Sequence, residues 1–512
     1  MLTQRKTAVF DNRDIVFMLL FLIGSIAAVN FSFFGGFNLG FTISYLFFAI
    51  LSLFYISFQT FRYTGFSLFC LLCAVLLALS FGLHANMLMK WISFCAIIVL
   101  TAIFLSLSMG TVKYGADSYL FFVDLLKTVF VVPTVFIGET VESFLQKCRK
   151  KKDKKYGFGV VVGVLLAIPV LLIIVPLLAS ADDAFRGFLS YVAVDFSGEG
   201  IISLVFGFVL FLFLFSMAFA YRKGLTRNEV TQRTGVLEKR HDANPAMINT
   251  FLALISFVYV VYLFSQLAYF VNAFSGILPA NYSLSEYARS GFFEMAFLCA
   301  VNFLLLFITL FFTKYKNGKR LLSTRLLATF ICVFSLFLCC SVFAKLFMYI
   351  DRYGMTPLRV YTLLFTLFLT LLFLLAIVRL YVVRIPYIKI AAVSAAVLCV
   401  ATAFGNVDGV IARYNENAYQ SGSIEELDVA LLGDLSDAAV PVLVRLLDED
   451  DQNLAQSAAE VLAQKAEKYF VMQNKNFIIE REDEDFRSYN RVRQQAKALI
   501  LDNWEKIQEL LV

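Results

Sequence analysis

Runs of about twenty apolar residues recur along this 512-residue chain, and they constrain its fold more than any other feature. A helix of about that length crosses the roughly 30 Å hydrocarbon core of a bilayer. Because a backbone in lipid must satisfy its own hydrogen bonds, each run is predicted to be a helix. The predicted spans are 15–34, 38–58, 65–83, 90–109, 157–179, 200–220, 247–272, 290–312, 323–350, 358–380 and 387–405.

The composition agrees with this interpretation. Hydrophobic residues make up 60% of the chain and charged residues 16%, whereas soluble domains are about a quarter charged. The 57 phenylalanines exceed what a soluble core can bury, but lipid can solvate them. We therefore predict an all-α polytopic transmembrane helical bundle of about eleven spans, followed by a small C-terminal helical extramembrane domain.

The net charge of +6 divides unevenly along the chain. Residues 404–512 include 21 acidic and 11 basic residues, and the preceding residues include 33 basic and 17 acidic ones. The positive charge thus belongs to loops between spans and the negative charge to the tail. This distribution predicts the lipid bilayer as a partner and argues against nucleic acid.

Orientation follows from the lysines and arginines of short loops, which favour the cytoplasmic side. The basic stretches near 147–155, 222–240, 314–325 and 379–389 alternate correctly with eleven spans. The N-terminus is therefore predicted inside, in a bacterial cytoplasmic membrane, with the tail outside. We assign residues 119–137, which are apolar but include Asp124, Lys127 and Pro133, to the inner interface or a re-entrant hairpin.

The predicted domains are a transmembrane domain (1–405), a linker at the outer face (406–422) and an acidic helical domain (423–512). Thr356-Pro357 and Asn244-Pro245 are typical helix starts. Ser423-Ile-Glu-Glu426 resembles a capping box, and Asp451 precedes another helix. The 434–464 segment resembles one HEAT-type helix pair, and a small bundle that caps the membrane domain is the favoured alternative.

No recognisable reaction or ligand motif occurs in the sequence. There is no Walker loop, no HExxH and no metal-ligand spacing. The two histidines, His84 and His241, lie in different loops, and Cys70-x-x-Cys73 falls in an apolar helix where packing is the favoured role. We therefore predict no catalytic residues, no metal and no cofactor.

Polar residues do gather near the predicted outer ends of the last four spans, at similar depth on one face. An ionisable residue within a span is costly and needs a partner. Glu294 and Lys345 fall at similar depth, so we predict that they pair. The candidate cluster is Tyr287, Arg289, Glu294, Lys345, Asp351, Arg352, Arg359, Tyr361, Asp408 and Arg413.

Three stretches of this region together resemble a known family. They begin at Tyr287, Tyr353 and Asn406, and read YARSGFFE, YGMTPLRVY and NVDGVIARYN. They resemble the bacterial membrane family catalogued as domain of unknown function 4173, over residues of about 60–440. The resemblance implies a bacterial membrane host and a multi-pass fold, without an activity.

Three functions stay open. The favoured one is a non-enzymatic envelope scaffold, sensor or accessory subunit that acts through its outer face and meets a protein partner through the C-terminal domain. The second is a transporter of a small solute or lipid that uses Glu294 and Lys345. The third is a membrane enzyme on lipid-linked substrates. The sequence does not indicate an oligomeric state.

Overall fold

The computed structural model describes most of the predicted helices of the chain. The described residues are 9–56, 62–110, 120–149, Ile174, 198–225, 243–275, 292–313, 321–382, 384–473, 478–481 and 485–511. Within them, ten helices are long and apolar enough to cross a membrane, and Phe297–Phe312 is a shorter apolar helix. This confirms the predicted all-α polytopic class. The predicted span 157–179 lies outside the described residues.

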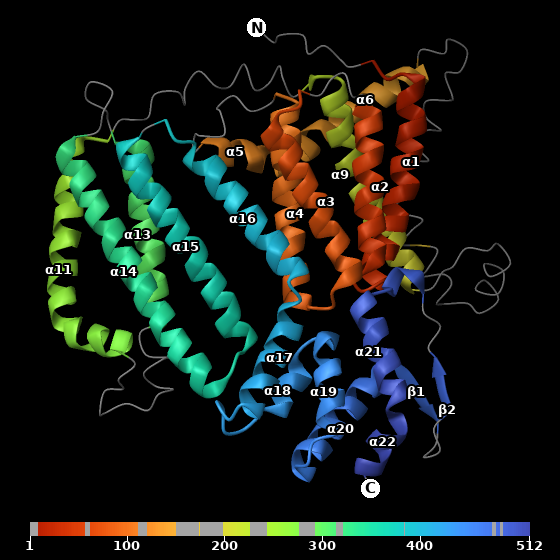
Figure 1. Ribbon diagram of the computed structural model, residues 1–512. Helices are drawn as coiled ribbons and strands as arrows, with labels where there is room; N and C mark the ends of the chain where they lie inside the picture. The colour runs from red at the N-terminus through yellow and green to blue at the C-terminus, as the bar shows by residue number, and fades with distance from the viewer. Residues whose placement is uncertain are drawn as a thin grey trace. The chain divides into compact units, whose positions relative to one another are not determined.

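The chain forms two compact units, and residues 476–495 of the tail belong to the first of them. Unit 1 consists mainly of the helices of the N-terminal half (Figure 1). Its elements are α1 (Asn12–Val29), the π-helix η1 (Asn30–Phe34), α2 (Leu39–Ile56), α3 (Gly65–Leu83), α4 (Met87–Ser108), α5 (Leu120–Leu126), the π-helix η3 (Lys127–Val131), α6 (Val132–Arg149), α9 (Gly198–Arg222), β2 (Ile478–Arg481), the short 3₁₀ helix η6 (Phe486–Ser488) and the start of α21 (Arg491–Asp502).

An aromatic core holds unit 1 together. Phe21, Tyr55 and Phe215, from α1, α2 and α9, are almost completely buried and pack against one another. Phe10 adds a stacked contact with Phe219, with ring centroids 5.4 Å apart. Aromatic pairs of this kind contribute packing energy even where lipid removes the hydrophobic driving force between helices.

The run α5–η3–α6 contains the segment 119–137 that we assigned to the inner interface. By length and composition, Asp124–Lys147 is one of the ten helices that could span a membrane. Its contacts nevertheless lie at one end of unit 1: Thr128 bonds Ser106 near the end of α4, and Lys147 bonds Asn12 at the start of α1. The assignment of this run to the inner interface or a re-entrant hairpin stays a prediction.

The tail residues of unit 1 lie at its opposite end. Asn490 donates its side-chain amide to the carbonyl oxygens of Phe81 and His84, at the end of α3. Arg487 hydrogen-bonds Asn30, where α1 gives way to η1. Because α1 runs from Asp11 at one end to Asn30 at the other, this part of the tail is at the end of unit 1 opposite to Asp11.

Unit 2 contains the remaining membrane helices and most of the tail (Figure 1). Its elements are α11 (Pro245–Ser275), α13 (Phe292–Phe312), α14 (Leu322–Tyr353), α15 (Pro357–Tyr381), α16 (Tyr387–Phe404), α17 (Val407–Gln420), α18 (Val429–Asp434), the 3₁₀ turn η5 (Asp437–Ala439), α19 (Val440–Leu446), α20 (Gln452–Glu467), β1 (Phe470–Gln473), the end of α21 and α22 (Trp504–Leu510).

Polar side chains join the membrane helices of unit 2 at their centre. Asn302 of α13 accepts a hydrogen bond from Tyr259 of α11 at 2.5 Å and donates one to Ser335 of α14 at 2.9 Å. The ring of Tyr259 stacks on Phe334, with centroids 4.1 Å apart. Buried amide and hydroxyl groups in lipid find partners on neighbouring helices, and here they fix three helices together.

The tail helices of unit 2 pack into a small bundle. Leu443 of α19, Leu462 of α20 and Ile507 of α22 are completely buried. The compact units divide the chain differently from our predicted boundaries, because residues 406–475 cluster with the membrane helices that precede them. The prediction that 423–512 forms a domain of its own stays a prediction.

Candidate functional site

The structure describes the side chains of seven of the ten predicted cluster residues at or near one end of unit 2. Tyr287 and Arg289 lie outside the described residues, and Glu294 is in α13 with a side chain outside them. The predicted Glu294–Lys345 pair is therefore untested, although Lys345 is half-buried on α14. The described residues at this end are Asp351, Arg352, Arg359, Tyr361, Asp408 and Arg413.

The loop between α14 and α15 is held by Asn415, a residue of α17 that the predicted cluster did not include. Its side-chain oxygen accepts the N–H of Met355 at 2.6 Å, and its side-chain amide donates to the Met355 carbonyl at 2.9 Å. Asn415 is 4% exposed. The loop is shaped by Gly354 at φ +73°, where a Cβ would lie 2.6 Å from the Asn415 oxygen. A side chain at position 354 would therefore displace this clamp.

Arg359 also holds the loop between α14 and α15. Its guanidinium donates to the carbonyl oxygens of Tyr353 and Gly354, at the end of α14. The guanidinium also lies 3.9 Å from the ring centroid of Tyr349. A cation at a helix C-terminus satisfies exposed carbonyls and is favoured by the helix dipole. These contacts give Arg359 a structural role in the loop.

Asp408 joins the membrane helices to the tail bundle. It is 3% exposed in the first turn of α17, and its carboxylate accepts the N–H of Ser436 at 3.1 Å. Ser436 is the N-cap residue of η5. The carboxylate thus bonds the tail backbone directly before α19, and buried carboxylates of this kind need such donors.

The other predicted residues are nearer to solvent. Arg352 pairs with Glu425 at 2.6 Å, and both side chains are more than half exposed. Arg413 is exposed and bonds a carbonyl of its own helix. Partial burial, and then the charge of Asp351, raise the pKa of Tyr414. Arg413 is thus an exposed member of the predicted cluster.

Three further tail residues carry buried polar contacts that the sequence reasoning missed. Glu416, 5% exposed, accepts two hydrogen bonds from Arg445 at 2.7 and 2.5 Å, and these raise the pKa of Arg445. Lys465 is 5% exposed and donates to the Leu435 carbonyl at 2.9 Å, while burial lowers its pKa. For Glu416 a sequence signal existed, because Asn415 and Glu416 lie on the face of the amphipathic α17 that also holds its apolar residues.

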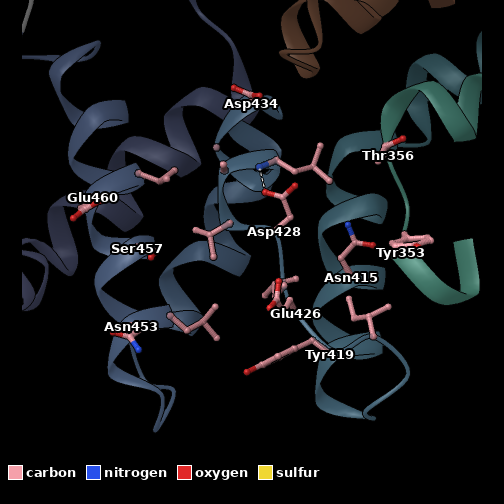
Figure 2. Close-up of a pocket in the computed structure, with 18 of the residues that line it drawn as sticks. Tyr353, Thr356, Asn415, Tyr419, Glu426, Asp428, Asp434, Asn453, Ser457 and Glu460 are labelled. Atoms are coloured by element: carbon pink, nitrogen blue, oxygen red, sulfur yellow. Dashed lines mark hydrogen bonds between the residues drawn. The ribbon is translucent and has the colours of Figure 1, made fainter. Parts of the chain in front are cut away.

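A polar groove of about 1370 Å³ lies beside these contacts, within unit 2. Figure 2 shows Asn453, Ser457 and Glu460 of α20 on one wall and Tyr353 and Asn415 on the other. Six acidic and four basic side chains line the groove. Among these side chains, Arg352 and Glu425 pair with each other, and Arg359 and Lys465 have the partners described above. The lining of the groove therefore has a small excess of acidic side chains.

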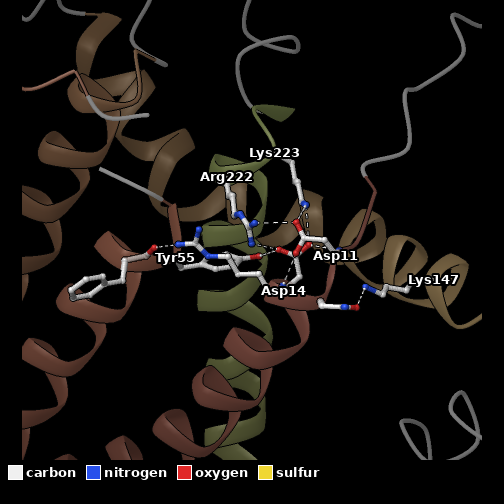
Figure 3. A network of polar contacts seen from close by, with 9 residues as sticks. Asp11, Asp14, Tyr55, Lys147, Arg222 and Lys223 are labelled. Carbon is white, nitrogen blue, oxygen red and sulfur yellow. Dashed lines mark hydrogen bonds and ion pairs between the residues drawn. The ribbon is translucent and has the colours of Figure 1, made fainter. Parts of the chain in front are cut away.

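A second charged network lies in unit 1, at the start of α1 (Figure 3). Asp14, which is fully buried, is bonded by Arg222, by Lys223 at 2.8 Å and by the hydroxyl of Tyr55 at 2.8 Å. Asp11 caps α1 and pairs with Arg222 at 3.0 Å and Lys223 at 3.3 Å. Two carboxylates and two cations balance, so the network carries no net charge.

This network was missed because we used Arg222 and Lys223 only as evidence of orientation. Although burial opposes it, the Asp14 N–H and the charges of Lys223 and Arg222 hold the pKa of Asp11 below its usual value. The network fastens α9 to α1 at the basic end of unit 1. Among the residues that the structure describes, no cluster of histidine, cysteine or carboxylate side chains is arranged to hold a metal ion.

The fold and these contacts define the class: an integral membrane protein with many apolar helices and a helical tail. The chain belongs to the family described as domain of unknown function (DUF4153), whose profile matches residues 71–446. Our expectation of the family numbered 4173 was wrong in that detail and right about a family of unknown function. No curated protein and no solved structure is detectably similar to this chain.

Proposed function

We propose that this protein is a non-enzymatic membrane scaffold that holds its helical tail rigidly at one face of the bilayer. The observation that carries the proposal is the way Asn415, Asp408 and Arg359 use their polar groups. Each bonds backbone groups of the α14–α15 loop or of the tail. A catalytic or transport site needs polar groups that meet a substrate, whereas these groups stabilise a junction.

The proposed orientation has the N-terminus in the cytoplasm and the tail outside, in a bacterial cytoplasmic membrane. In unit 2, Arg325 is near the start of α14 and Arg379 near the end of α15, while the tail follows the opposite helix ends. In unit 1, Asn490 bonds the end of α3 that lies away from the Asp14 network. The rule that basic loops stay inside therefore favours an external tail in both units.

Labelling of a single cysteine tests this orientation. Ser421→Cys lies in the turn after α17, and the native cysteines are replaced in the same chain. A membrane-impermeant maleimide added to intact cells is expected to label it. Labelling that requires cell lysis would reverse the orientation.

The partner proposed for the scaffold is a protein segment with basic residues in an extended conformation. Acidic side chains outnumber basic ones in the groove along α20, and opposite charge steers and orients a partner. Glu426 and Glu460 are among the carboxylates that line it.

The scaffold proposal is tested by photo-crosslinking from the groove in living cells. A photoreactive residue at Ser457, which lines the groove, is expected to give one discrete adduct. The matched control is the adjacent Gln456, which is exposed and does not line the groove. The charge reversal Glu460→Lys is expected to abolish the Ser457 adduct. Equal adducts from both positions, or an adduct insensitive to the reversal, would contradict the proposal.

The transporter and enzyme alternatives have a separate test. Glu294→Gln and Arg359→Ala are examined together in purified protein reconstituted into vesicles. The scaffold proposal predicts that Glu294→Gln leaves folding and tail docking unchanged and that neither variant alters solute flux or lipid turnover. A normally folded Glu294→Gln protein that loses a measurable flux would replace the scaffold with a transporter.

A further inference from the structure

A second hollow lies among the membrane helices of unit 1. Its lining is apolar, unlike that of the polar junction. It is a crevice of about 490 Å³, lined by residues of α1, η1, α2, α4 and α9 together with Leu71 of α3. Nearly all of its surface is apolar, with Phe41, Phe48, Phe104 and Phe206 among its walls. Ligand sites of small molecules have volumes of roughly 300–1,000 Å³, so the space is sufficient for a chain-like ligand.

Tyr45, Thr101 and Ser44 supply polar groups to the walls, and these groups are bonded within the protein. The hydroxyl of Tyr45 bonds that of Thr101 at 2.9 Å. The Ser44 hydroxyl donates to the Gly40 carbonyl at 2.8 Å, within the same helix. A polar solute would find few partners here and would lose its hydration, which makes it a poor occupant.

The crevice runs along the helix axes. Its lining residues on α9 extend from Ile202 to Met217, which at 1.5 Å per residue is about 22 Å. One leaflet of a bilayer core is about 15 Å thick, so an acyl chain that stands along the membrane normal runs in this direction and fits within the length of the crevice. At Gly207, α9 approaches α1 so closely that a Cβ would lie 2.6 Å from the Cα of Ile26.

The crevice is open toward lipid near the end away from the Asp14 network. Phe33, Ile202 and Phe206 line it and are 63%, 38% and 60% exposed. All three lie near the ends of α1 and α9 that are opposite to Asp14 and Arg222. A lipid of that leaflet can therefore enter sideways without passing through the helices.

We propose that this crevice binds an acyl chain of a bilayer phospholipid from the leaflet opposite to the basic end of unit 1. The hydrophobic effect does not drive this binding, because lipid tails are as apolar as the crevice walls. The gain comes from contact: an unfilled void leaves the lining atoms without dispersion partners, and a chain supplies them. The chain thereby becomes a structural part of the packing between α2 and α9.

The test uses the full chain in phosphatidylcholine vesicles that contain a phosphatidylcholine with a diazirine group in one acyl chain. After irradiation, peptide mass spectrometry locates the adducts. We expect them to concentrate on the crevice residues of α2 and α9 rather than on the exposed lipid-facing residues Leu72 and Val99. Adducts spread evenly over lipid-facing residues would overturn the proposal, and this comparison needs no variant.

A filled crevice gives the matching control. Ala49→Trp places a large ring in the crevice and is expected to lower the crevice adducts by about tenfold, the effect of losing roughly 1.4 kcal/mol of binding. Val99→Trp adds the same ring at a lipid-facing site, 48% exposed, and is expected to leave the adducts unchanged. Equal adducts in Ala49→Trp and wild type would contradict a bound chain in this crevice.

The chain itself offers a rival occupant. Cysteines placed in turn along 157–179, each combined with Ala49→Cys, report whether that segment fills the crevice. We expect no disulfide between them under mild oxidation. A quantitative disulfide would show that the protein's own segment is the occupant and would overturn the lipid proposal.

Discussion

Replacing Asn415 with alanine is predicted to release the tail from the α14–α15 loop. The substitution removes both partners of the Met355 backbone, at 2.6 and 2.9 Å. Leaving a buried backbone group unpaired costs about 1–3 kcal/mol. Met355 is only half-buried, so water replaces part of the loss, and we expect about 2–3 kcal/mol for the pair.

That free energy raises the ratio of undocked to docked tail by roughly 30- to 150-fold. Limited proteolysis of the purified protein in lipid nanodiscs measures this ratio, because cleavage of an opened segment follows the population of the open form when reclosing is fast. We expect cleavage near 415–425 to accelerate by a similar factor in Asn415→Ala.

Asn417→Ala is the matched control. Asn417 is on the same helix and is exposed, and the same atoms are removed there without loss of a buried contact. We expect its cleavage rate to equal that of the wild type. Wild-type cleavage in Asn415→Ala, or the same acceleration in Asn417→Ala, would refute the assignment of Asn415 as the clamp.

Three other perturbations have defined outcomes. Asp14→Asn leaves Arg222 and Lys223 without their buried carboxylate. It is expected to destabilise unit 1 by about 3 kcal/mol, measured by a thermal-shift assay in detergent. An unchanged melting midpoint would contradict the network's role. Glu416→Gln weakens the pair with Arg445, whose side chain is 52% exposed. Solvent screening therefore limits the expected loss of unfolding free energy, measured by urea titration, to about 1 kcal/mol. A loss above that of Asp14→Asn would refute this reasoning. Burial, Arg491 and Lys90 lower the pKa of His84 below 6.5, so the unfolded chain takes up the proton first and stability falls as the pH drops from about 7.5 to about 5.5. His84→Gln is expected to flatten that dependence in melting curves, and an unchanged slope would assign it to another group.

Helix positions in the membrane were predictable because a span needs only length and apolarity. Thr356 caps α15 with Pro357 in its first turn, as the residues indicated, and Asp451 caps α20. The capping box expected at Ser423 was wrong. Residues 421–425 form turns, and Asp428 caps α18 by accepting the Leu431 N–H. Local signals of equal quality recur within a few residues, and tertiary packing selects among them.

The candidate site was predictable only in part. The sequence indicated that polar residues gather where the last spans meet the tail, and Asp408 and Arg359 do make junction contacts. It did not indicate which residues pair. Asn415 acts on Met355, sixty residues away, and hydrogen bonds over such separations depend on the fold rather than on local spacing.

The same limit explains the Asp14 network. Asp14 lies at the start of the first apolar run, where a solvated carboxylate is the ordinary expectation. Its partners, Arg222 and Lys223, are more than two hundred residues away and come to it only because α9 packs against α1. Charge counts along a sequence give orientation, but they do not distinguish a free cation from a paired one.

The central claim is that the tail is docked rigidly on the membrane helices of unit 2, and a distance measurement tests it most directly. Spin labels at Leu358, 69% exposed at the start of α15, and at Gln456, exposed on α20, report on the two sides of the junction. Double electron–electron resonance in nanodiscs is expected to give one narrow distance distribution in the otherwise wild-type protein and a broad one in Asn415→Ala. A broad distribution before any junction residue is changed would contradict the account.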